Sequence, residues 1–225
     1  MTGHESSRNA PALMFDEATS VRDGFGRAMV ELGRANPRVV ALTADLTEPC
    51  RLQSFAEHYP DRFFQMGISE NDMIGTAAGL AINGFIPFAT TFSVFATSLA
   101  NQPVRLSVAY NNCNVKIAVS HGGITVGADG ATHQSFEDVG IIRLIPNMVV
   151  IVPADANEAY EATLAAAAYE GPVFLRLSRT AAAPTQGRPE PFSIGPAYEL
   201  QKGKDVALFA CGPMVELTIK AAEEL

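Results

Sequence analysis

The sequence predicts an α/β protein in which helices cover both faces of a parallel sheet. Apolar strand-like runs alternate with helical patterns from residue 16 to about residue 179, joined by short connections that contain Gly or Pro. The strand-like runs are almost continuously apolar, which is typical of parallel strands buried on both faces. With 225 residues, 48% of them hydrophobic, the chain can bury one good core and begin a second.

The elements follow one another in regular order along this region. We expect strands at 39–42, 63–65, 86–90, 115–119, 148–152 and 173–177. We expect helices between them, near 16–35, 51–59, 70–83, 93–110, 134–144 and 156–169.

The two ends of the chain depart from this alternation. Residues 1–14 are polar and predict a flexible N-terminus, followed by one domain at 15–180. The Pro and Gly residues of 181–203 indicate a linker or an extended crossover. A strand at 205–210 and a helix from Met214 follow. One strand and one helix cannot bury both of their faces, so 204–225 is expected to be the truncated start of another α/β domain.

Charge and cysteine content exclude several classes of protein. A net charge of -8 without a basic run argues against nucleic acid or an anionic membrane as partner. Cys50, Cys113 and Cys211 are scattered and form no CxxC pair, which argues against a disulfide framework or a structural zinc site. We find no apolar signal core and no run of about 18 apolar residues. A cytoplasmic protein that handles small molecules fits these properties.

A carboxylate lies where the strand at 63–65 gives way to the following helix, in Gly67-Ile68-Ser69-Glu70-Asn71-Asp72. The carboxyl ends of parallel strands are where α/β sheets form ligand sites, so Glu70 is a candidate catalytic or binding residue. A simple helix-start Glu, favoured by the helix dipole, explains this hexapeptide equally well when it is taken alone.

A glycine-rich loop at 120–134 follows the fourth strand and contains His121 and His133. Its four glycines permit positive φ and a close approach of backbone to ligand. It is neither a P-loop nor a dinucleotide fingerprint, because Lys and the required glycine spacing are missing. A metal site of His121, Asp129 and His133 is a minor alternative, since no carboxylate pattern supports it. Histidines acting on a sugar or oxyacid as acid, base or hydrogen-bond donor fit best.

Two aromatic residues, Phe92 and Phe95, lie where the third strand turns into a helix. Core aromatics at positions i and i+3 are the simpler explanation of such a pair. Here they share the expected sheet edge with Glu70 and the histidine loop, where an aromatic ring can stack on a flat heterocycle.

In order and spacing, these segments resemble the pyrimidine-binding domain of transketolases. The resemblance covers about 15–180 and, more narrowly, is to the free-standing C-terminal subunit of a split bacterial or archaeal transketolase. Residues from Lys204 resemble the start of the third domain of that family. The matching segments are Ala44-Asp45-Leu46, Arg62 through Glu70, Thr91-Phe92, Gly127-Ala128-Asp129-Gly130 with His133, and Arg143 to Met148.

The resemblance implies thiamine diphosphate as cofactor and gives each candidate a role near it. Glu70 matches the Glu that bonds a ring nitrogen of the aminopyrimidine and favours its imino tautomer. Phe92 matches the aromatic that stacks on the pyrimidine, and Phe95 lines the same pocket. Asp45 matches an Asp near the cofactor at the subunit boundary.

The resemblance also implies a substrate site for a sugar or sugar phosphate. His121 and His133 match substrate-facing histidines with catalytic roles, and Asp129 matches a residue that contacts a sugar hydroxyl. Arg22 and Arg179 match arginines that grip the sugar phosphate, although each could equally be a solvated surface charge.

Two residues depart from the family pattern. Pro49 stands about where phosphosugar transketolases have a phosphate-binding Ser, and Ser98 stands where an aromatic often completes the pyrimidine pocket. These departures put the size and phosphorylation of the substrate in question, and not the cofactor.

Half of the family's cofactor site is missing from this sequence. The resemblance predicts a Gly-Asp-Gly motif followed by Asn-Asn, which would hold Mg²⁺ and the diphosphate, but the chain lacks this combination. No metal ligand is therefore predicted here. An N-terminal transketolase subunit is expected to bind Mg²⁺ and the diphosphate, in a homodimer or α2β2 assembly that packs on the small and apolar helix faces at 75–79 and 96–110.

The sequence thus indicates a transketolase subunit that helps to transfer a two-carbon ketol unit between sugars. Three alternatives stay open: the beta subunit of a 2-oxoacid dehydrogenase decarboxylase, a fragment like 1-deoxyxylulose-phosphate synthase, and a non-catalytic regulatory subunit. The pair His121 and His133 suits polyol recognition and favours the transketolase.

Overall fold

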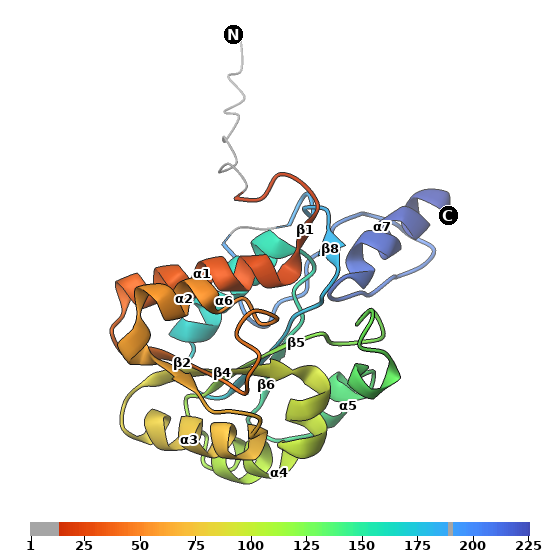
Figure 1. Cartoon of the computed structure of the whole chain (residues 1–225). Coiled ribbons are helices and arrows are strands. Elements are labelled where there is room, and N and C mark those ends of the chain that lie inside the picture. The colour runs from red at the N-terminus through yellow and green to blue at the C-terminus, as the bar shows by residue number, and fades with distance from the viewer. Residues whose placement is uncertain (1–13, 189–190) are drawn as a thin grey trace.

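A six-stranded parallel sheet lies at the centre of the computed structural model, which describes residues 14–188 and 191–225 (Figure 1). The strand order is β3-β2-β4-β5-β7-β6, and every neighbouring pair is parallel, so the predicted sheet is confirmed. Most of the predicted flexible N-terminus, residues 1–13, lies outside the described residues. The strands are β2 Val39–Thr43, β3 Phe63–Gln65, β4 Ile86–Phe92, β5 Lys116–Ser120, β6 Val149–Ile151 and β7 Val173–Arg176.

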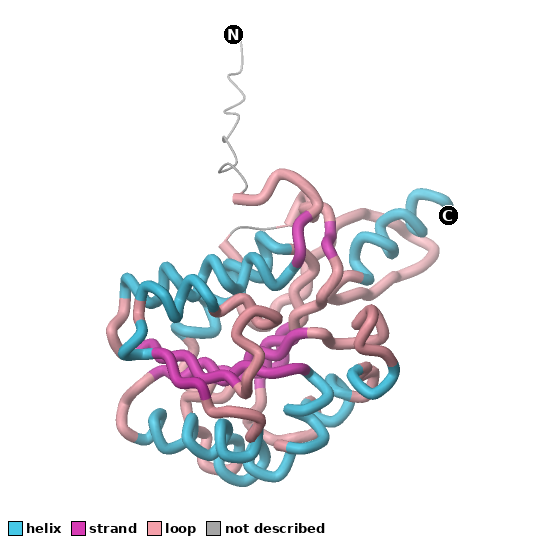
Figure 2. Tube along the Cα trace, viewed as in Figure 1, coloured by secondary structure: helices cyan, strands magenta, loops and turns pink. Residues whose placement is uncertain are grey.

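Helices form a layer on each face of this sheet, as Figure 2 shows. One layer holds α1 (Val21–Ala35), α2 (Gln53–His58) and α6 (Ala156–Ala168), and the other holds α3 (Glu70–Ile82), α4 (Asn101–Pro103) and α5 (Asp138–Ile142). Alternate residues of one strand supply the two cores. In β2, Val39 and Ala41 pack under α1 and α6, whereas Val40 and Leu42 pack against α3.

The helix expected at 93–110 forms as an irregular series of helical turns with a bend at Ala100. Wide π-helical turns at Phe95–Leu99 (η2) and Val104–Ala109 (η3) flank α4, which contains Pro103. Proline has no N–H and cannot continue ordinary helical bonding. Beyond it, the Tyr110 N–H bonds to the carbonyl of Arg105, five residues back. Buried small and apolar side chains still reach the core from this segment, namely Ala96, Ala100, Val104 and Val108.

Two predicted helices are shorter than expected because their ends pair with distant backbone. Instead of beginning near residue 16, α1 begins at Val21, since Thr19–Ser20 forms β1 antiparallel to β8, Ala181–Ala182. The helix expected at 134–144 is reduced to α5, since Ser135 pairs with Gly123 as an isolated bridge. Only the tertiary fold brings these partners together.

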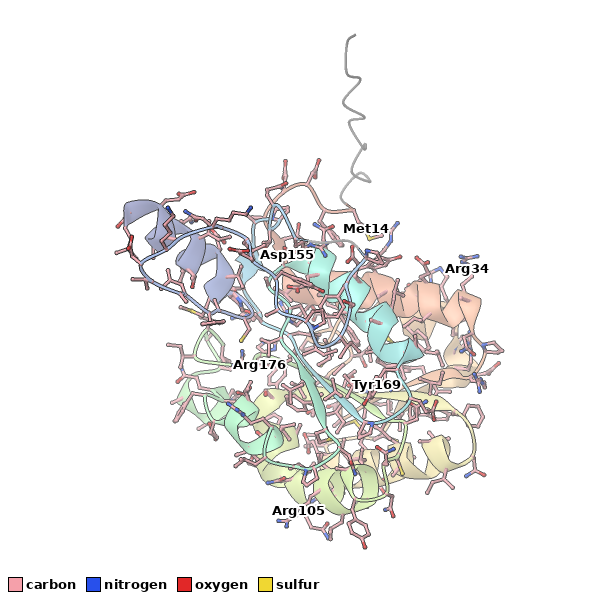
Figure 3. The ribbon with its side chains drawn as sticks, turned by 180° about the vertical axis from the view of Figure 1, so that it is seen from behind. Met14, Arg34, Arg105, Asp155, Tyr169 and Arg176 are labelled. Carbon is pink, nitrogen blue, oxygen red and sulfur yellow. The ribbon has the colours of Figure 1, made fainter. Side chains whose placement is uncertain are left out.

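The expected linker at 181–203 is tied to α6 along part of its length. Asp155 caps α6 by accepting the Glu158 N–H at 2.9 Å, and its second oxygen accepts the Thr185 N–H at 2.8 Å (Figure 3). Arg188 forms an ion pair with Glu161 at 2.8 Å. The segment therefore forms part of the layer over α6.

The strand predicted at 205–210 does not form. Among the described residues, no strand lies beside this segment to pair its N–H and C=O groups, and Phe209 is 88% exposed. The predicted helix after it is confirmed as α7, Met214–Glu224, which projects from the edge of the molecule in Figure 1.

The crossing of α1 over α6 predicts a sharp cost for one added methyl group. A Cβ at Gly24 would lie 1.9 Å from the carbonyl oxygen of Ala156, so Gly24→Ala must push the two helices apart. We expect a loss of about 1–3 kcal/mol in the free energy of unfolding, measured by urea titration with circular dichroism.

Gly75→Ala is the matched control, because a Cβ at Gly75 of α3 meets nothing within 4 Å. Its higher helix propensity should leave stability equal or up to about 1 kcal/mol higher. Equal stability of both variants would contradict the packing described here.

Candidate active site

Parallel pairing brings the ends of three strands and their candidate residues to one sheet edge. Glu70 follows β3, Phe92 ends β4, and His121 follows the last residue of β5. The register pairs Phe92 with Ser120, which places Phe92 beside the start of the glycine loop. Open α/β sheets form their ligand sites at this edge, as the sequence predicted.

Glu70 is buried at the first position of α3. Its side chain is 6% exposed, and its Oε1 accepts the hydroxyl proton of Thr91 at 3.4 Å. Thr91 is itself fully buried at the end of β4. A carboxyl group in such surroundings can form a strong hydrogen bond with one ring nitrogen of a heterocycle.

Four predicted site residues form one cluster of rings. The Phe92 and His121 ring centroids are 3.9 Å apart, and the Phe92 and Phe95 rings are nearly parallel at 5.9 Å. His133 lies edge-on to both phenylalanines, at 6.0 and 5.4 Å. The predicted stacking surface and both predicted histidines are thus brought together.

The imidazole of His121 is buried among positive charges. It is 4% exposed, and its Nδ1 lies 2.9 Å from the hydroxyl oxygen of Ser120. Burial, together with the charges of Arg22 and Arg179, lowers the pKa of His121 to about 4, against the opposing charge of Asp129. The ring is therefore neutral at neutral pH.

The two predicted phosphate-binding arginines lie on the same side of the site as His121. Arg22 is 8% exposed and donates to the Pro49 carbonyl at 2.8 Å. Burial lowers the pKa of Arg22, and Arg51 adds to this effect. Arg179 is exposed and donates to the carbonyl of Val126 in the glycine loop. A Cβ at Gly127 would collide with the Arg179 guanidinium, so this position requires glycine.

Asp45 and Asp129 are exposed and stand outside the cluster of rings. Asp45 has a φ of 58°, and its N–H donates to Oε1 of Gln65 at 2.7 Å. The same oxygen accepts the Gly67 N–H at 3.3 Å, which joins the loop after β2 to the loop that leads into Glu70.

Sequence reasoning missed an ion pair beneath the glycine loop. Nε of Arg176, labelled in Figure 3, lies 2.7 Å from Oδ2 of Asp138, which also accepts the Ser93 hydroxyl at 2.6 Å. Asp138 is 1% exposed. A Cβ at Gly122 would lie 2.6 Å from the Arg176 Nε, so the loop can rest on this arginine only with glycine there. The pair Gly122-Gly123 is the sequence signal that could have indicated such a support.

Two kinds of feature are absent from the part of the chain that the structure describes, residues 14–188 and 191–225. No group of three or more His, Cys, Asp or Glu side chains within them could hold a metal ion. No helix in this part of the chain is long and apolar enough to cross a membrane.

Comparison with known proteins places this fold in one class, that of transketolase pyrimidine-binding domains. Residues 17–184 match the family described as transketolase, pyrimidine binding domain. The chain therefore belongs to the transketolase family, and the resemblance seen in the sequence is confirmed.

Individual relatives show which kinds of transketolase this chain is similar to. A putative transketolase C-terminal section from Methanocaldococcus jannaschii is 42% identical, covering 91% of this chain and 66% of the relative. A 6-deoxy-6-sulfo-D-fructose transketolase subunit from a Clostridium species is 40% identical, with coverages of 96% and 67%. A solved split gene transketolase, an inactive beta4 tetramer, is 43% identical with a TM-score of 0.77, covering 92% of this chain and 67% of its own.

Synthases of another kind also match. A 1-deoxy-D-xylulose-5-phosphate synthase from Desulforudis audaxviator is 37% identical over 93% of this chain and 33% of its own length. The chain spans about two thirds of the length of the transketolase subunits and about one third of the synthase.

The lowered pKa of His121 predicts a loss of stability in mild acid. Between its folded pKa of about 4 and its usual value of 6.5, the unfolded chain binds a proton that the native chain does not. His121 therefore contributes stability that is present above pH 6.5 and is lost as the pH falls toward 4. At pH 5 this loss should be about 2 kcal/mol relative to pH 7.

Urea unfolding of wild type and His121→Gln at both pH values measures this effect. The variant should lose less stability between pH 7 and pH 5, since the other titrating groups are common to both proteins. His58→Gln, at an exposed position of α2, is the matched control and should behave as wild type. Equal pH dependence of wild type and His121→Gln would contradict the buried neutral imidazole.

Proposed function

We propose that this chain is the pyrimidine-binding subunit of a thiamine diphosphate-dependent transketolase that moves a two-carbon ketol unit between sugars. The observation that carries the proposal is the buried carboxyl of Glu70 beside a stack of aromatic rings at the carboxyl edge of the sheet. Family membership and the split transketolase relatives support it.

The residues at this edge fit the aminopyrimidine half of the cofactor. When bound, thiamine diphosphate supplies a carbon nucleophile and an electron sink for ketol transfer. The Phe92 ring offers a flat face for the pyrimidine, and Glu70 exchanges a proton with a ring nitrogen. Thr91 orients that carboxyl through its hydroxyl. Asp45, exposed two residues after the end of β2, is proposed to meet the cofactor at the subunit boundary.

The polar residues around the rings fit a sugar. His121 and His133 provide ring nitrogens for its carbonyl and hydroxyl groups, and Asp129 adds a carboxylate at the rim. Arg22 and Arg179 supply two guanidinium groups for an anionic end of the substrate. The backbone carbonyl of Pro49 accepts one Arg22 N–H. A Ser at this position would also offer a side-chain hydroxyl to the substrate, which Pro49 lacks.

A partner subunit is proposed to bind Mg²⁺ and the diphosphate. The faces at 75–79 and 96–110 support an assembly, because their outer side carries exposed apolar residues and no added Cβ at Gly75 or Gly79 meets a neighbour. Obligate interfaces are apolar in this way. The exposed apolar residues here are Leu99, Leu106 and Tyr110, together with Ile82 at the end of α3.

A second candidate activity is that of a 1-deoxyxylulose-phosphate synthase-like enzyme, which the similarity to such synthases supports. Parallel assays with a ketose donor and a 2-oxo acid donor, each with thiamine diphosphate, Mg²⁺ and the co-purified partner, distinguish the two. Turnover of the ketose donor is the expected result.

Glu70→Gln should remove most ketol transfer and leave the fold intact. The amide cannot exchange the proton with the cofactor ring, and general acid–base groups contribute roughly 10²–10⁴-fold to the rate. Turnover by the reconstituted complex measures the effect, with unfolding curves as the check on folding. Glu57→Gln, on the exposed side of α2, is the matched control and should keep full activity. More than about a third of wild-type turnover in Glu70→Gln would refute the assignment.

The chain alone should show little magnesium-dependent affinity for thiamine diphosphate, because the diphosphate half of the site belongs to the partner. Calorimetry should detect tight binding only after the partner is added.

Gly79→Arg should lower the mass of the assembly in light scattering by filling the open face of α3. Gly140→Arg is the matched control, also at an open exposed position. Tight binding by the chain alone, or assembly by Gly79→Arg, would argue against the split site.

A further inference from the structure

A row of buried polar side chains leads across the sheet to His121. Thr43, Thr90 and Ser120 stand at or near the ends of β2, β4 and β5, and none is more than 1% exposed. They lie on the sheet face toward α1 and α6, where the same strands otherwise present apolar residues such as Ala41 and Phe88. Cys50, 2% exposed, lies against this row.

Two contacts of this row join Cys50, Ser120 and His121 in a chain that ends on the imidazole. Sγ of Cys50 lies 3.6 Å from Oγ of Ser120, and that Oγ lies 2.9 Å from Nδ1 of His121. The Thr90 hydroxyl donates to the Leu42 carbonyl at 3.1 Å, so its proton is already engaged. Ser120 is thus the one hydroxyl in this row that contacts both the thiol and the imidazole.

The chemistry of these three groups decides which atom donates and which accepts in each hydrogen bond. Burial raises the pKa of Cys50 to about 11, against the opposing hydrogen bonds from Ser120 and Thr90, so the thiol keeps its proton. A thiol sulfur is a weak acceptor, whereas the unprotonated nitrogen of a neutral imidazole is a good one. The Ser120 hydroxyl therefore donates a hydrogen bond to Nδ1 of His121, where the contact is short. Its oxygen accepts the weak hydrogen bond from the Cys50 thiol.

We propose that Ser120 is a positioning residue that holds His121 in the neutral tautomer protonated at Nε2, with the Cys50 thiol supporting it from behind. Arg22 and Arg179 disfavour a second proton on the ring, against the opposing charge of Asp129, and His133 adds to their effect. His121 then offers its substrate an N–H and no basic nitrogen. Resting on the proposed function, this makes His121 a hydrogen-bond donor to a ketose oxygen and not a general base.

Nitrogen-15 NMR of the histidine-labelled chain tests the tautomer without any activity assay. The sequence has four histidines, and the His121→Gln variant identifies the His121 signals by their loss. In wild type at pH 7, Nε2 of His121 should resonate as a protonated ring nitrogen and Nδ1 as an unprotonated one. Protonation of Nδ1 in wild type would overturn the proposal.

Substitutions then test whether Ser120 is the cause. Ser120→Ala should give a mixture of both tautomers, whereas Ser120→Thr, which keeps a hydroxyl on the strand, should retain the wild-type form. Ser135→Ala is the matched control, because the Ser135 hydroxyl is equally buried but makes no hydrogen bond within the described residues. A wild-type spectrum in Ser120→Ala, or a mixture in Ser135→Ala, would overturn the role of Ser120.

Kinetics of the reconstituted complex separate this proposal from the proposed function. Loss of one hydrogen bond in Ser120→Ala should lower kcat/KM by about fivefold to tenfold, with recovery in Ser120→Thr. A wild-type complex without ketol transfer would refute the proposed function, while the NMR result would still decide the tautomer. Full kcat/KM in Ser120→Ala with a changed tautomer would refute the donor role of His121.

Discussion

The parallel pairing of β3, β2, β4 and β5 is the constraint on which the rest of this structure depends. Because the strands run in one direction, their carboxyl ends meet at a single edge. Glu70, Phe92 and His121 are separated by more than twenty residues in sequence, yet each follows or ends a strand of this set. A shift of one residue between β4 and β5 would move Phe92 away from Ser120 and turn its ring to the opposite face of the sheet.

Several buried polar groups at this edge are each stabilised by a specific partner. Asp138 has Arg176 and Ser93, Glu70 has Thr91, and His121 has Ser120. Burying a charge without a partner costs several kcal/mol, so these contacts decide which side chains the edge can carry. The glycine loop rests directly on two arginines of β7 and the residues after it, where any side chain at Gly122 or Gly127 would collide.

The candidate site lies partly inside the sheet edge and partly at its exposed rim. The rings and Glu70 lie inside the edge, while the carboxylates of Asp45 and Asp129 and the guanidinium of Arg179 stand exposed at its rim. The helix layer beside Glu70 carries open glycines and exposed apolar side chains, whereas the opposite layer is covered in part by the segment that Arg188 and Thr185 tie to α6. The candidate site and the exposed apolar side chains of this helix layer therefore lie on neighbouring parts of the molecule.

The sequence by itself determined the sheet, most helices and the candidate residues, because these depend on local periodicity and on which residues follow a strand. All six central strands were predicted, and so were Glu70, Phe92, Phe95, His121 and His133, of which the structure brings the four aromatic and imidazole rings into contact. Asp45 and Asp129 were predicted with them, but local pattern could not tell that they are exposed.

Only the tertiary structure decided the features that depend on a distant partner. The strand β1 exists because β8 lies beside it, whereas 205–210 has strand-like residues but no described neighbour and remains unpaired. Lys116 begins β5, in which apolar residues follow it up to Ser120. It is fully buried, since Asn114, Tyr169 and Gly171 each place an oxygen within 2.5 to 2.7 Å of its Nζ. The Asp138–Arg176 pair joins residues 38 positions apart. Backbone groups and buried charged side chains find hydrogen-bond partners on residues remote in sequence, so a local pattern cannot predict these contacts.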